Sequence, residues 1–190
     1  MSTMALILAA GASTRMGKPK ALVKSGGTTL LRQVSDPYEH IDIPVVVITG
    51  FHANKVEPFL KDLCLDFVRN PAPWRGMISS VRTGLHAVPR TVDHVFIHPV
   101  DCPGVTPDTL QILMASLRAF PAAGGAKPTF RQRGGHPLLL AKPTWLRVLS
   151  RRYTDLRSAV AGSSDYMLRI ELDDAAVLND FDTPASLEAH

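Results

Sequence analysis

The residues best suited to chemistry lie in a glycine-bearing loop close to the N-terminus. An apolar run over residues 5–10 leads into residues 11–20, which read GASTRMGKPK. Small residues let the backbone approach a ligand closely, and successive backbone N–H groups can form a concave anion-binding nest. Arg15, Lys18 and Lys20 add three cations within six residues, and this charge suits a polyphosphate. A solvated loop with merely exposed basic side chains is the alternative that composition alone leaves open.

Two common phosphate-binding loops do not match this segment. A Walker A loop has four residues between its glycines and then Lys followed by Ser or Thr. Here Gly11 and Gly17 enclose five residues, and Lys18 is followed by Pro19. The dinucleotide-binding fingerprint has its second glycine where this chain has Ser13. The loop therefore belongs to neither class.

A polyphosphate site also needs a divalent cation, which bridges phosphate oxygens and offsets the charge of two approaching anions. Asp101 follows directly after the apolar run 95–99. Because parallel strands bring their carboxyl ends to one edge of a sheet, we expect Asp101 on the same edge as the glycine loop. Taken alone, an aspartate just before Pro103 equally fits a turn or a helix cap.

Short apolar runs alternate along the chain with longer amphipathic segments. This alternation predicts an α/β fold with an open, mostly parallel central sheet and helices on both faces. The helix near residue 107 has Thr106 as its expected N-cap and Pro107 as its first residue. Strands are expected at residues 5–9, 45–49, 65–69, 95–99, 125–130, 136–141, 168–172 and 176–178, and helices at 29–34, 52–63, 78–87, 107–120, 144–151 and 156–161.

Composition excludes several classes of protein. A length of 190 residues predicts one domain over residues 1–190, and 45% hydrophobic residues exclude a disordered chain. A net charge of +4 without a block of like charges indicates no nucleic-acid partner. The N-terminal apolar run is too short for a secretory or membrane segment, so we expect a cytoplasmic protein without a membrane partner. Cys64 and Cys102 lie beside apolar runs and are expected to be buried free thiols.

Residues 8–20, LAAGASTRMGKPK, resemble the signature loop L-A-A-G-x-S-x-R-M-G-x-x-K of the MobA-like nucleotidyltransferases. Within that family the loop is most similar to the molybdenum cofactor cytidylyltransferases, since guanylyltransferase relatives tend to read L-A-G-G. The resemblance implies a three-layer, Rossmann-like nucleotidyltransferase fold. It also implies that Arg15 and Lys20 are catalytic and stabilise charge on the triphosphate and the departing pyrophosphate. Five loop residues are implied to bind the nucleotide: Leu8, Ala10, Gly11, Ala12 and Ser13.

A second block of the chain is similar to the same family. Residues 76–85, GMISSVRTGL, resemble its G-M-x-x-S-L-x-x-G-L segment. The resemblance implies that Gly76, Met77 and Ser80 contact the nucleobase. Without the family context, serines in the first turn of a helix are typical of N-caps.

Two further blocks imply a metal site and an acceptor side. Asp101 matches the family's aspartate-x-proline pattern, and Asp180 matches the first aspartate of its D-x-D-T-P-E-D-L ending. The resemblance implies that both hold Mg²⁺, with Asp101 also contacting the nucleotide.

Residues 134–140, GGHPLLL, resemble the acceptor-side G-H-P-V-L-L segment and imply that His136 contacts the acceptor. A lone histidine at a strand start is otherwise typically structural. Residues 151–157 lack the glycines of the family's G-D-x-G-x-R type segment.

Together these features predict a magnesium-dependent nucleotidyltransferase. The expected reaction transfers CMP from CTP to a small phosphorylated acceptor, with molybdopterin as first choice, and releases pyrophosphate. A molybdoenzyme that receives the product is the partner this implies. Two alternatives from other classes stay open: a nucleotide- or cofactor-binding delivery module without turnover, and a flavin- or nicotinamide-dependent reductase on a related scaffold.

Overall fold

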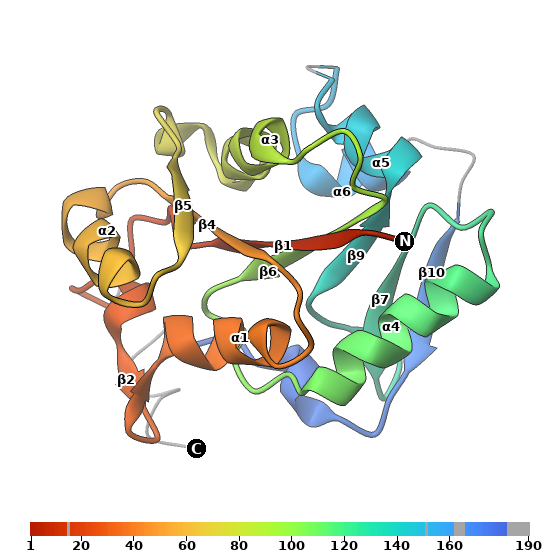
Figure 1. The fold of residues 1–190 in the computed structure, drawn as a ribbon, viewed down its shortest axis with the longest axis horizontal. Coiled ribbons are helices and arrows are strands. Elements are labelled where there is room, and N and C mark those ends of the chain that lie inside the picture. Colours follow the sequence, from red (N-terminus) through yellow and green to blue (C-terminus); the bar gives the residue numbers. More distant parts are fainter. Residues whose placement is uncertain (15, 151, 162–165, 182–190) are drawn as a thin grey trace.

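A mixed, mostly parallel sheet forms the centre of the protein, and helices cover both of its faces (Figure 1). The computed structural model describes residues 1–14, 16–150, 152–161 and 166–181. Within these ranges eight strands form one sheet in the order β10-β7-β9-β6-β1-β4-β5, with β8 paired to β7. Their bounds are β1 (Thr3–Leu8), β4 (Val45–Thr49), β5 (Asp66–Arg69), β6 (His94–Pro99), β7 (Gly125–Phe130), β8 (Arg133–Gly134), β9 (Leu138–Ala141) and β10 (Met167–Glu171), and a separate hairpin joins β2 (Lys24–Ser25) to β3 (Thr28–Thr29).

The strand directions decide where a ligand can bind. β1 pairs in parallel with β4 and with β6, and β4 pairs in parallel with β5. β9 is antiparallel to its neighbours β6 and β7. The carboxyl ends of β5, β4, β1 and β6 therefore meet at one edge of the sheet, which is where open α/β sheets bind their ligands.

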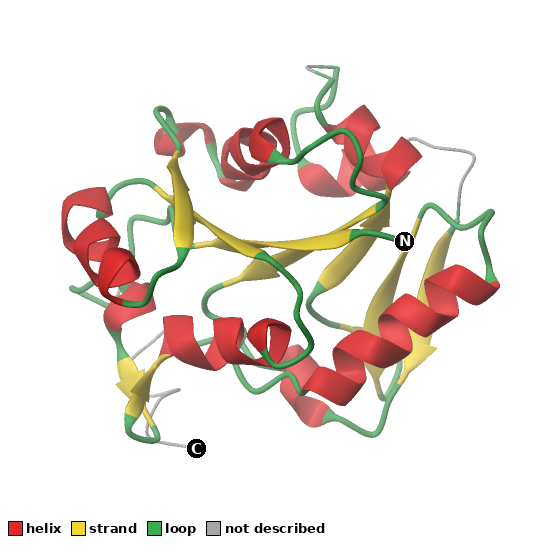
Figure 2. Cartoon of the chain, in the orientation of Figure 1, coloured by secondary structure: helices red, strands yellow, loops and turns green. Residues whose placement is uncertain are grey.

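Two large hydrophobic clusters form most of the core, one on each face of the sheet. Side chains alternate along β1, so that Ile7 joins one cluster and Leu6 the other. One face is covered by α1 (Leu30–Glu39), α2 (Ala53–Asp62) and α4 (Pro107–Ala119), and the other by α3 (Met77–Ala87), α5 (Lys142–Val148) and α6 (Leu156–Ala161). Figure 2 shows the resulting order of helices, strands and helices, which confirms the predicted three-layer α/β fold.

The structure corrects the predicted C-terminal strand. Residues 176–178 belong to the 3-10 helix η3 (Ala175–Leu178). The Asp174 side chain accepts a hydrogen bond from the Ala176 N–H (3.0 Å), which caps this helix. The Val177 carbonyl accepts the His136 N–H (2.8 Å). Because Pro137 has no N–H to donate to a ladder, β9 begins at Leu138 and not at His136.

Two helices also differ from their predicted lengths. The predicted helix 29–34 continues as α1 to Glu39 and passes through Pro37, because the fully buried Tyr38 packs into the core near the end of that helix. The helix predicted over residues 144–151 instead ends at Val148. For α4 the prediction is confirmed: Thr106 caps the helix by accepting the Thr109 N–H (3.3 Å).

The two cysteines are free, but only Cys102 is buried as predicted. Cys64 is exposed because it follows the last turn of α2 in a left-handed conformation, with φ of 56°. Among the described residues no helix is both long and apolar enough to cross a membrane.

Candidate functional site

Two adjoining cavities, of about 210 and 240 Å³, open at the carboxyl edge of the sheet. Leu8, Gly11, Ala12 and Asp101 line both of them. Together they reach the size range of small-molecule sites, roughly 300–1,000 Å³. The cavity of about 210 Å³, the loop cavity, is also lined by Ser13, Pro19, Lys20 and His52. The cavity of about 240 Å³, the helix cavity, is also lined by Ala10, Phe51, Pro73, Gly76, Met77 and Ser80.

Residues 11–14 of the glycine loop line the loop cavity. Ser13 has a left-handed backbone conformation, with φ of 49°, and its hydroxyl accepts the backbone N–H of Lys20 (3.2 Å). Within the described part of the chain, the backbone N–H groups of residues 11–14 donate to no protein acceptor. A run of such groups around a left-handed residue is the arrangement that binds anions. The loop therefore has the donors that a polyphosphate needs.

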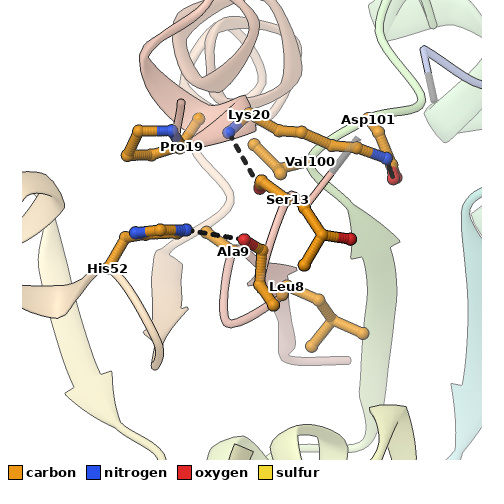
Figure 3. Close-up of a pocket in the computed structure, with 12 residues that line it drawn as sticks. Leu8, Ala9, Ser13, Pro19, Lys20, His52, Val100 and Asp101 are labelled. Atoms are coloured by element: carbon orange, nitrogen blue, oxygen red, sulfur yellow. Dashed lines mark hydrogen bonds and ion pairs between the residues drawn. The ribbon is translucent and has the colours of Figure 1, made fainter. Parts of the chain in front are cut away.

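Lys20 and Asp101 form an ion pair beside this loop. The Lys20 Nζ lies 2.6 Å from Asp101 Oδ2, and the two side chains are only 14% and 24% exposed. Lys20 begins the 3-10 helix η1 (Lys20–Leu22) after Pro19, and Asp101 follows β6. Figure 3 shows the lysine side chain reaching across the loop cavity to the carboxylate. The site thus holds a cation and an anion whose charges balance each other.

A buried network fixes the segment that carries Asp101. The His98 Nε2 lies 2.9 Å from the Cys102 carbonyl, and its Nδ1 lies 2.9 Å from the Tyr38 hydroxyl. Because a carbonyl can only accept, Nε2 carries the proton, and Nδ1 accepts from Tyr38. Burial lowers the pKa of His98 to about 3 and raises the pKa of Tyr38. Both groups are therefore neutral near pH 7 and hold the turn after β6 in place.

The segment after β4 also contacts the glycine loop, although it contains none of the predicted site residues. A Cβ on Gly50 would lie 2.7 Å from the Ala10 Cβ and carbonyl oxygen, so the two loops are in close contact. The Phe51 N–H donates to the Ala10 carbonyl (3.3 Å). The His52 Nε2 lies 2.7 Å from the Ala12 carbonyl oxygen. The sequence signal for these residues is their position directly after the buried strand β4.

The helix cavity is built around the start of α3. Gly76 precedes this helix with φ of 80°, and no side chain caps it, so neither serine acts as the N-cap. The buried Asn70 donates to the Ser79 hydroxyl (2.8 Å) and to the Ser80 hydroxyl (3.0 Å). At the surface around the start of α3, three large apolar side chains are exposed: Phe51, Trp74 and Met77.

Two predicted site residues within the described part of the chain, Asp180 and His136, line neither cavity. Arg15 lies outside the described residues. Asp180 is exposed, but the Phe181 N–H donates to the Asp101 carbonyl (2.8 Å), which places the C-terminal segment against Asp101. His136 has a buried Nδ1 that has no hydrogen-bond partner among the described residues. Burial lowers the pKa of His136, and the negative charge of Asp101 opposes that shift.

Asp101 and Asp180 both influence the pKa of the Cys102 thiol. Burial raises the pKa of Cys102, and the charges of Asp101 and Asp180 raise it further. In the ranges that the structure describes, no three His, Cys, Asp or Glu side chains cluster so as to hold a metal. A metal at this edge would therefore need ligand oxygens in addition to the two carboxylates.

A family model and a characterised relative both match most of this chain. A family model described as "MobA-like NTP transferase domain" matches residues 5–166. The chain is 28% identical over 182 residues to the molybdenum cofactor cytidylyltransferase of Escherichia coli (strain K12), covering 94% of this chain and 90% of that protein.

Solved structures share the fold. A crystal structure from Mycobacterium sp. strain JC1 has a TM-score of 0.81 at 24% identity and covers 98% of this chain and 93% of its own. A structure from Mycobacterium tuberculosis H37Rv in complex with manganese has a TM-score of 0.73 at 20% identity and covers 100% of both chains. At these identities the likeness concerns the fold alone.

Proposed function

The chain belongs to the MobA-like NTP transferase family, and on this premise we propose that it transfers CMP from CTP to a small phosphorylated acceptor, with molybdopterin as first candidate, and releases pyrophosphate. Family membership confirms the expected enzyme class, a nucleotidyltransferase. The observation that carries the proposal is the ion pair of Lys20 and Asp101 beside glycine-loop N–H groups that donate to no acceptor among the described residues. No observation favours a delivery module or a reductase.

The loop cavity would hold the triphosphate. The N–H groups of Gly11, Ala12 and Ser13 offer neutral donors, and Lys20 offers a charge that a bound phosphate can share with Asp101. Charge-assisted hydrogen bonds of this kind are about twice as strong as neutral ones. Arg15 has the same proposed role by its place in the family motif.

The donor set at this edge fits a hard divalent cation. Asp101 and Asp180 come from separate segments that lie against each other, and both offer only oxygen ligands. Mg²⁺ is usually held by one or two carboxylates together with substrate phosphates. We propose that these two aspartates would hold it, and that the bound ion would offset charge on the phosphate oxygens.

The helix cavity would hold the base. Asn70 donates to the Ser80 hydroxyl oxygen, so the hydroxyl proton can point to a ligand. Met77 adds a backbone N–H at the start of α3, whereas the Gly76 N–H donates to the Pro73 carbonyl (3.2 Å). The Ser80 hydroxyl and the Met77 N–H are donors, and the O2 and N3 atoms of cytosine are acceptors. Guanine instead presents N–H donors on the corresponding edge, which supports the preference for CTP.

The reaction needs little proton transfer. An oxygen of the acceptor phosphate attacks the α-phosphorus, the bond from the α-phosphorus to the bridging oxygen breaks, and pyrophosphate leaves. A phosphate monoester is already largely ionised at neutral pH, so positioning and charge neutralisation by Lys20 and Arg15 account for most of the acceleration. His136 has a proposed role on the acceptor side by its place in the family motif, and its buried Nδ1 has no hydrogen-bond partner among the described residues.

We place this reaction in the cytoplasm, where reducing conditions keep thiols such as the exposed Cys64 free. A molybdoenzyme that receives the product is the partner that the proposal implies.

The test is a matrix of nucleotides and acceptors. The protein is incubated with Mg²⁺, each of the four common NTPs and a panel of phosphate monoesters that includes molybdopterin, and pyrophosphate is measured. We expect release with CTP and one acceptor, and at least about tenfold less with GTP, because one mismatched polar edge costs on the order of 1–3 kcal/mol. Equal rates with CTP and GTP would contradict the assignment of the base site. No release with any pair, from folded protein, would refute the proposed transfer.

A further inference from the structure

His52 contacts the glycine loop through its side chain. Its Nε2 lies 2.7 Å from the Ala12 carbonyl oxygen, and Figure 3 shows the imidazole pointing at the loop from the residue before α2. Because a carbonyl can only accept, Nε2 carries the proton and donates it. The Nε2–H that this bond requires is one of the two ring N–H positions of histidine.

The bond fixes the direction of one peptide group. In a trans peptide the C=O and the following N–H point in opposite directions. The Ala12 carbonyl turns toward His52, so the N–H of Ser13 turns away from His52, and it donates to no protein acceptor among the described residues. If the peptide were reversed, the cavity would present a carbonyl oxygen to a polyanion in place of a donor.

The loop needs such a restraint. Ser13 has φ of 49°, a conformation that residues other than glycine seldom adopt. Its hydroxyl accepts the Lys20 N–H (3.2 Å) on one side, and the His52 bond holds the Ala12 carbonyl on the other. These two bonds flank the Ala12–Ser13 peptide and keep it in one orientation before any ligand arrives.

We propose that His52 is a positioning residue for the nucleotide triphosphate: its hydrogen bond to the Ala12 carbonyl keeps the Ser13 N–H directed at a phosphate. This inference rests on the proposed nucleotide-binding function and adds a residue outside the family motifs. His52 acts through the loop backbone, so its loss weakens triphosphate binding and leaves acceptor binding intact.

Two variants separate the hydrogen bond from the bulk of the side chain. His52→Leu fills the space without a donor, whereas His52→Gln places an amide N–H near the position of Nε2. His40→Leu is the matched control, since His40 is exposed at the end of α1. Calorimetry measures the Kd of each protein for CTP and for inorganic tripolyphosphate, both with Mg²⁺, and steady-state kinetics give the acceptor KM.

We expect His52→Leu to weaken both CTP and tripolyphosphate about tenfold, the effect of losing one hydrogen bond to a charged group. His52→Gln and His40→Leu should stay within about twofold of the original protein, and the acceptor KM should not change. In a ¹⁵N correlation spectrum the Ser13 amide should shift in His52→Leu more than in His52→Gln.

Unchanged affinity in His52→Leu would overturn the proposal, and so would an equal loss in His52→Gln. A rise in acceptor KM as large as the rise in the Kd for CTP would show a general structural role instead. If the unsubstituted protein binds neither CTP nor tripolyphosphate, then the proposed nucleotide function itself fails. That result is distinct from the failure of the His52 assignment.

Discussion

Lys20→Ala is expected to lower turnover by about 100-fold, the typical effect of removing one preorganised charge contact in a closed site. The Lys20 side chain is 14% exposed and its Nζ lies 2.6 Å from the Asp101 carboxylate. In this partly dehydrated position a cation acts more strongly on a triphosphate than it would in water. The variant removes the charge that would stabilise both the bound triphosphate and the departing pyrophosphate. The loss should appear in kcat and in kcat/KM for CTP.

Lys18→Ala is the matched control for this change. Lys18 lies on the same loop two residues earlier, but it is exposed, and exposed charges contribute little because solvent screens them. We expect its turnover within about threefold of the original rate. An unchanged rate in Lys20→Ala, or an equal loss in both variants, would contradict the role of Lys20.

Asp101→Asn is expected to lower turnover by about 100-fold or more, since it removes the carboxylate while keeping the size of the side chain. The position is held by the His98 bond to the Cys102 carbonyl and by the Phe181 N–H bond to the Asp101 carbonyl. Neither bond uses the Asp101 carboxylate, so the turn should survive the change. The expected loss is therefore one of metal and phosphate binding, and the Mg²⁺ concentration for half-maximal rate should rise.

Asp108→Asn provides the comparison, because Asp108 is an exposed carboxylate in the first turn of α4. Its activity and Mg²⁺ dependence should match those of the unsubstituted protein. Thermal unfolding of both variants separates a loss of function from a loss of folded protein. An Asp101→Asn variant that keeps its rate and its Mg²⁺ dependence would refute the metal role of Asp101.

Local patterns were sufficient to predict the edge of the sheet at which the site lies. A β-branched run such as Val45–Thr49 predicts a buried strand from its own residues, and parallel strands place the loops that follow them on one edge. The glycine loop and Asp101 each follow such a strand. Both lie together in the structure, lining the same two cavities.

Contacts between distant segments could not be predicted in the same way. Lys20 and Asp101 are 81 residues apart, and His52 and Ala12 are 40 residues apart. Their bonds depend on the order of strands in the sheet, which a single sequence does not encode as a local pattern. Similarly, α1 extends through Pro37 because Tyr38 packs in the core near His98, and tertiary packing of this kind overrides local helix signals.

Nucleotidyl transfer can be tested by following the two ends of the triphosphate separately. CTP labelled with ³²P at either the α- or the γ-phosphorus is incubated with the protein, Mg²⁺ and the acceptor selected by the nucleotide matrix. We expect the α label in the acceptor and the γ label in pyrophosphate, in equal amounts. Release of the γ label as orthophosphate, or of the α label as free CMP, would contradict nucleotidyl transfer at this site.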